Sequence, residues 1–135
     1  EFSYRKDEEI YGEDEPAEYV YQIIRGAVRT YKLLTDGRRQ IGAFHLPGDV
    51  FGLESESAHR LAAEAIIDTT VRLVTRRNLE QAAASDVHVA RKLWTITAGK
   101  LRHAEDHMLL LGRKSAMERV ANFLLELRRD HDPMK

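Results

Sequence analysis

The stretch Val87–Leu111, VHVARKLWTITAGKLRHAEDHMLLL, decides how the rest of this 135-residue chain is organised. Apolar or small side chains recur in it at alternating intervals of three and four residues, which is the spacing of a seam between two helices. These positions are Val87, Ala90, Trp94, Thr97, Leu101, Ala104, Met108 and Leu111. The pattern predicts one long helix that pairs with the same helix of a second chain.

A second interpretation of this helix is that its apolar residues cover the remainder of their own chain. A second stripe, made of Leu93, Ile96 and Leu110, could serve for such a contact. A helix with two apolar stripes must be buried on two sides, which is more than one small barrel can provide, so the pattern favours a dimer. The predicted dimer interface consists of Trp94, Thr97, Leu101, Ala104, Met108 and Leu111.

Short segments rich in aromatic and β-branched residues precede the long helix and predict seven or eight strands. The clearest lie at residues 10–11, 19–24, 27–34, 39–46, 62–67 and 70–74, with a short apolar element at 50–52. Asp36-Gly37 predicts a hairpin turn, and residues 76–84 predict a small helix. Because the helices follow the strands, the order excludes a parallel βαβ fold and favours a jelly roll or small barrel.

The ends of the long helix also have sequence signals. Ser85-Asp86 is a good N-cap, and Gly112 predicts a break. Ser115 to Glu118 has the pattern of a capping box, which predicts a second, amphipathic helix that ends at Asp132-Pro133. We therefore expect two separate helices in this part of the chain.

The composition is that of a globular protein, with 43% hydrophobic and 32% charged residues. No apolar run approaches the roughly 20 residues that a membrane span needs, and residues 1–19 lack the apolar core of a signal peptide. The chain contains no cysteine, which excludes disulfides and thiolate metal sites and fits a cytoplasmic location. With 21 basic and 22 acidic residues, the chain lacks the basic excess of a DNA-contacting domain.

Several segments, in this order and spacing, resemble the CRP/FNR family of transcription regulators. The segments are Tyr21–Arg29, Asp36–Ile41, Leu46–Gly52, Gly99–Leu111 and Lys114–Leu125. Within the family, Phe51–Glu54 and Ala63–Ile66 most resemble the FixK-like branch of rhizobia and their relatives.

The resemblance implies an α+β fold, in which a cyclic-nucleotide-binding-like β jelly roll (a double-stranded β-helix) is followed by helices. The implied domains are a jelly-roll sensor at 1–85, a dimerisation helix at 86–112 and the start of a DNA-binding domain at 113–135. The implied function is a homodimeric transcription activator of low-oxygen or nitrogen-fixation genes. Its implied partners are RNA polymerase and DNA, the latter bound through a helix-turn-helix expected after Lys135. The resemblance implies no enzyme activity and no cofactor.

Nucleotide-binding members of the family hold their ligand on a segment that starts Gly-Glu-Leu or Gly-Glu-Ile and ends Arg-Ser/Thr-Ala. The matching candidates here are Gly52, Glu54, Ser57 and Arg60. The Glu stands one place late, and Leu61 replaces the hydroxyl residue. These departures favour a vestigial or unliganded pocket. A stand-alone jelly roll that binds a cyclic nucleotide or another small ligand is the alternative.

Histidines give little support to a metal site or an enzyme. His103 and His107 share a helix face, but the zinc-protease pattern needs Glu directly after the first His, so a solvated face is favoured. His45 and His59 are isolated, and the His-x-His pair of a metal-dependent cupin is absent. The sequence predicts no metal ligand and no catalytic residue.

Overall fold

The computed structural model describes the backbone of residues 1–130 and the side chains of residues 1–110 and 117–128. The chain forms two compact units, of which the first spans Glu1–Ala90 and the second begins at Arg91. The first unit contains all the strands that the structure describes, and the second is helical from Arg91 to Asp130.

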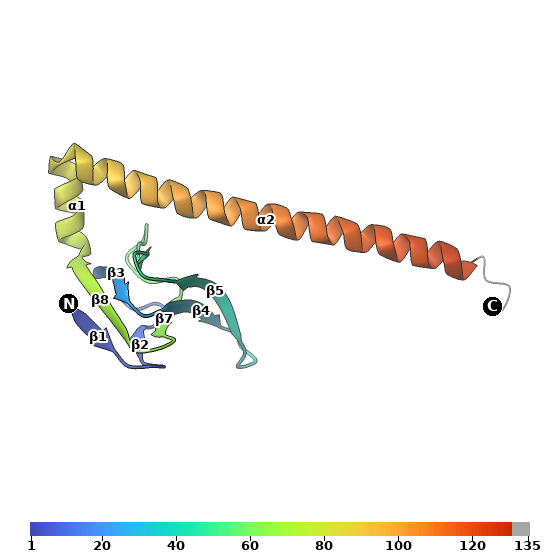
Figure 1. The fold of residues 1–135 in the computed structure, drawn as a ribbon, viewed down its shortest axis with the longest axis horizontal. Coiled ribbons are helices and arrows are strands. Elements are labelled where there is room, and N and C mark those ends of the chain that lie inside the picture. The colour runs from blue at the N-terminus through green and yellow to red at the C-terminus, as the bar shows by residue number, and fades with distance from the viewer. Residues whose placement is uncertain (131–135) are drawn as a thin grey trace. The chain divides into compact units, whose positions relative to one another are not determined.

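Eight strands form two antiparallel four-stranded sheets in the first unit (Figure 1). One sheet has the strand order β1-β8-β3-β6, and the other has the order β2-β7-β4-β5. The strands are β1 (Phe2–Tyr4), β2 (Glu9–Tyr11), β3 (Tyr19–Arg25), β4 (Val28–Leu33), β5 (Arg39–His45), β6 (Val50–Phe51), β7 (Ala62–Ala65) and β8 (Thr69–Thr75). This arrangement confirms the predicted jelly roll, and only β1 was not predicted.

Aromatic and β-branched side chains from both sheets form the core between them. The buried cluster consists of Tyr11, Tyr21, Ile23, Val28, Phe51, Ala63 and Val71. The rings of Tyr21 and Phe51 stack with centroids 5.0 Å apart. Because full burial of one large apolar side chain contributes about 1.5–3 kcal/mol, this cluster is the main source of stability in the unit.

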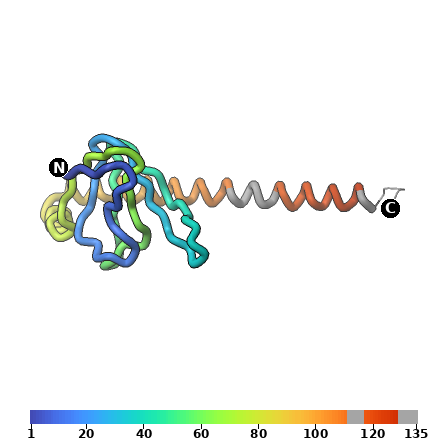
Figure 2. Tube along the Cα trace, turned by 90° about the horizontal axis from the view of Figure 1, so that it is seen from below, coloured from blue at the N-terminus to red at the C-terminus, as the bar shows by residue number. Residues whose placement is uncertain are grey.

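The predicted hairpin at Asp36-Gly37 joins β4 to β5. Its turn is closed by the amide of Leu34, which donates to the carbonyl of Arg38 at 2.8 Å. The side chain of Asp36 accepts from the amide of Arg38 at 3.0 Å. The hairpin projects from the body of the strands, as its cyan tube in Figure 2 shows.

Asp86 separates the small helix α1 (Arg76–Ser85) from the long helix α2 (Val87–Asp130). Its amide donates to the carbonyl of Ala82 at 2.9 Å and so ends α1. Its carboxylate accepts from the amide of His88 at 2.9 Å and so begins α2. The predicted N-cap is confirmed at Asp86.

The predicted break at Gly112 is wrong in this structure, because α2 runs as one helix from Val87 to Asp130. A glycine inside a helix costs only about 1 kcal/mol relative to alanine, and the helix-forming residues around it compensate for that cost. The boundary between a dimerisation helix and a further domain at 112/113 stays a prediction. The predicted end at Asp132-Pro133 and the side chain of Ser115 lie outside the described residues. Within the described part of the chain, no helix is both long and apolar enough to cross a bilayer.

Candidate ligand segment and helix seam

Residues 52–60 carry the predicted ligand residues and connect β6 to β7. Their backbone pairs with residues 14–17 and not with a regular strand. The amide of His59 donates to the carbonyl of Glu15 at 2.9 Å, and the amide of Ala17 donates to the carbonyl of Ser57 at 2.8 Å. The segment is therefore held in place by main-chain hydrogen bonds within its own chain.

Glu54 is turned toward groups of its own chain. Its Oε1 lies 3.4 Å from Nδ1 of His59, and the amide of Arg60 donates to the same oxygen at 3.4 Å. The His59 side chain is only 2% exposed and stacks on Tyr11 with ring centroids 3.6 Å apart. Burial, followed by the charge of Glu54, raises the pKa of Tyr11. His59, interpreted as isolated from the sequence, therefore lies between the buried Tyr11 and the partly exposed Glu54.

Leu61 lies against Gly42 on β5. A Cβ atom placed on Gly42 would lie 2.6 Å from Cδ1 of Leu61 and 3.5 Å from Oγ1 of Thr30. The leucine side chain thus lies close against β5 and offers no hydrogen bond there.

The remaining predicted ligand residues do not converge on one point. Gly52 has a φ of +84°, and a Cβ there would lie 2.9 Å from Cδ2 of Tyr21, so this position favours glycine for structural reasons. Ser57 and Arg60 are exposed, and Ser57 uses its carbonyl to bind Ala17. Among the described residues, the Arg60 guanidinium has no ion pair. Of the four predicted ligand residues, the structure brings together only Glu54 and the backbone of Arg60. A ligand site at these residues stays a prediction.

A buried charge cluster that the sequence analysis missed crosses the second sheet. Glu64 on β7 is 4% exposed, and its Oε1 lies 2.6 Å from Nε of Arg29 and 2.7 Å from Nη1 of Arg39. Arg39 also lies over the ring of Tyr31, with Cζ 4.6 Å from the centroid. The signal was a single carboxylate in the otherwise apolar strand AAEA, because a buried carboxylate needs a cationic partner.

The predicted seam of α2 is open to solvent in the single chain. The side chains of Trp94, Leu101 and Met108 are 74%, 60% and 69% exposed. Thr97 and Ala104 are exposed as well, and the side chain of Leu111 lies outside the described residues. Soluble chains rarely expose a row of large apolar residues of this length without a partner. The assignment of these residues to a dimer interface stays a prediction that this exposure supports.

No group of three or more His, Asp and Glu side chains in the described part of the chain is arranged to hold a metal ion. His103 and His107 are exposed on α2.

Comparisons with known proteins bear on the fold and on the family. The family model described as "Cyclic nucleotide-binding domain" matches residues 1–86. The nitrogen fixation regulation protein FixK of Azorhizobium caulinodans is 47% identical over 126 residues, which are 93% of this chain and 51% of that protein.

Two solved structures are also similar. The structure of FixK2 from Bradyrhizobium japonicum has a TM-score of 0.78 and 81% identity, and covers 96% of this chain and 65% of that chain. The Catabolite Activator Protein of Thermus thermophilus has a TM-score of 0.73 and 26% identity, with 97% and 63% covered. The chain therefore spans about half to two thirds of the length of these relatives.

These matches confirm the resemblance to CRP/FNR regulators of the FixK branch, and two of the relatives are named a nitrogen fixation regulation protein and a catabolite activator protein. Since the family model covers residues 1–86, which is more than half of the sequence, the chain belongs to the cyclic nucleotide-binding domain family.

Proposed function

We propose that this chain is the sensor and dimerisation part of a FixK-like transcription regulator that acts in the cytoplasm as a homodimer. The solvent-exposed seam of α2 carries the proposal, because Trp94, Leu101 and Met108 lie one heptad apart on a helix of 44 residues. The matches to FixK proteins support the same function. The near-neutral charge of the chain supports DNA contact by another part of the protein.

In the proposed mechanism, two copies of α2 pair and present two helix-turn-helix units to a two-fold DNA site. Such half-sites lie about one helical turn apart, or roughly 34 Å. The bound dimer would then recruit RNA polymerase to promoters of low-oxygen or nitrogen-fixation genes. Ala104 permits close approach of the two helices, and Trp94 and Met108 fill the space between them.

The same proposal assigns no cyclic nucleotide to the jelly roll. Glu54 already binds protein groups, and Leu61 occupies the position of the hydroxyl that nucleotide-binding members carry.

Sedimentation equilibrium at micromolar concentration tests the dimer. The unsubstituted chain is expected to have twice the 15.5 kDa mass of one chain. Leu101→Asp is expected to give monomers, because it places two charges at the apolar seam. Leu109→Asp is the matched control, since Leu109 is 64% exposed but lies outside the seam. Monomers of the unsubstituted chain, or equal effects of both substitutions, would exclude the proposed seam.

A further inference from the structure

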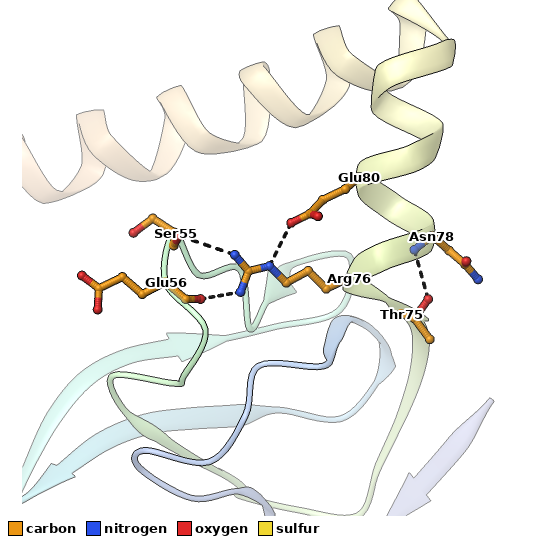
Figure 3. A network of polar contacts seen from close by, with 6 residues as sticks. All are labelled: Ser55, Glu56, Thr75, Arg76, Asn78 and Glu80. Atoms are coloured by element: carbon orange, nitrogen blue, oxygen red, sulfur yellow. Dashed lines mark hydrogen bonds and ion pairs between the residues drawn. The ribbon is translucent and has the colours of Figure 1, made fainter.

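We propose that Arg76, the first residue of α1, is a positioning residue that latches the 52–60 segment to α1. Its guanidinium donates to two main-chain carbonyls, those of Glu56 and Ser55, the latter at 3.4 Å. Its Nε also pairs with Glu80 one turn further along α1, at 3.0 Å. Figure 3 shows the guanidinium between the carbonyls and the carboxylate.

The backbone of Arg76 strengthens the same connection. Its amide donates to the carbonyl of Glu18 at 2.8 Å. Glu18 directly follows residues 14–17, which pair with residues 57–59. Arg76 thus binds the 52–60 segment directly through its side chain and indirectly through its amide.

The chemistry of this contact favours arginine. A planar guanidinium can donate to two carbonyls and one carboxylate at once, whereas a lysine ammonium acts as a compact point charge. The Arg76 side chain is 26% exposed, so its hydrogen bonds are partly shielded from water. The carbonyls of Ser55 and Glu56 belong to exposed residues, so without Arg76 they would be solvated and the segment would be freer to move.

The latch is connected to the start of α2 through α1. Helix α1 is only ten residues long, and Asp86 ends it and caps the first turn of α2. The segment held by Arg76 is therefore connected to the first residue of α2 through one ten-residue helix. This consequence rests on the proposed regulator function, in which α2 carries the output.

Hydrogen exchange of individual amides tests the latch. In Arg76→Met, the amides of Ala17 and His59 are expected to exchange about tenfold faster, as expected when a hydrogen bond to a charged group is lost. The amide of Ile23 on β3, which donates to the carbonyl of Asp49, should change its exchange rate by less than about twofold. Arg77→Met, at the exposed neighbouring position, is the matched control and should leave all three amides unchanged.

Two further variants separate the contacts of Arg76. Glu80→Gln removes the carboxylate but keeps the bonds to the carbonyls, so exchange at Ala17 and His59 should stay within about twofold of the original. Arg76→Lys keeps the charge but not the two-carbonyl contact, so it should reproduce the effect of Arg76→Met. If the amides of Ala17 and His59 exchange in Arg76→Lys at the rates of the unsubstituted chain, the latch is overturned. It is also overturned if the amide of Ile23 is accelerated as much as those two amides. If Arg76→Met does not fold, Arg76→Lys decides the question.

The dimer mass of the same variants distinguishes this inference from the proposed function. Arg76→Met with faster exchange and an intact dimer supports both. A monomeric unsubstituted chain with the same exchange pattern would contradict the dimer while leaving the latch standing.

Discussion

Arg39 on β5 reaches across β4 to Glu64 on β7, with its Nη1 2.7 Å from the buried Oε1. Arg29, on the intervening strand, pairs with the same oxygen. The β5 strand is an edge strand that pairs only with β4, so this ion pair ties it to the centre of its sheet. Three strands therefore share one buried carboxylate.

Substitution Glu64→Gln is expected to lower the free energy of unfolding by about 2–4 kcal/mol, because two guanidinium groups lose their common partner. Urea unfolding followed by circular dichroism measures the change. Glu80→Gln, which removes an exposed carboxylate from an i,i+4 pair, should change the free energy by less than about 0.5 kcal/mol. Equal effects of the two substitutions would contradict a structural role for the Glu64 cluster.

Alkaline pH is expected to destabilise the β-sheet unit through Tyr21. Burial raises the pKa of Tyr21 to about 12 from the usual 10.0, so the folded state favours the neutral phenol. The stabilisation that the neutral Tyr21 phenol adds to the free energy of unfolding is fully present below pH 10. It is lost as the pH rises from 10 to 12, because this tyrosine ionises in the unfolded chain before it ionises in the folded chain. Urea unfolding at pH 8 and pH 11 should show this loss, and Tyr21→Phe should reduce it. A pH dependence unchanged by Tyr21→Phe would assign the effect to other groups.

Titration calorimetry with cyclic AMP is expected to give no saturable binding. Leu61 offers no hydroxyl, and the Glu54 carboxylate lies beside His59 and the amide of Arg60. Arg60→Ala should therefore behave like the unsubstituted chain. Saturable binding that Arg60→Ala abolishes would instead favour the stand-alone ligand-binding jelly roll.

Local patterns predicted most of the strands, because their alternation and turn residues act over a few positions. The segment Tyr19–Arg25 and the Asp36-Gly37 hairpin are examples. The three-residue strand β1 was missed because FSY is too short for any periodicity to show. The break predicted at Gly112 failed because one glycine weakens a helix without forbidding it.

The contacts around the ligand segment were beyond sequence reasoning for a different reason. Tyr11 and His59 are 48 positions apart and meet only because two irregular segments pair through their main chains. Arg76 binds carbonyls, which every residue carries, so no side-chain pattern marks its partners. Family resemblance located the segment, but it did not predict which protein groups the segment binds.

Cross-linking through one introduced cysteine directly tests whether α2 pairs with the α2 of a second chain. The chain has no cysteine of its own, so any disulfide must form at the introduced site. In a parallel dimer related by a two-fold axis, Leu101→Cys places the two thiols facing each other at the seam, and a disulfide between them needs roughly 4 Å between the Cβ atoms. We expect mild oxidation to convert Leu101→Cys into a covalent dimer, while Leu109→Cys stays largely uncoupled. Equal coupling of the two variants, or none in Leu101→Cys, would contradict this pairing.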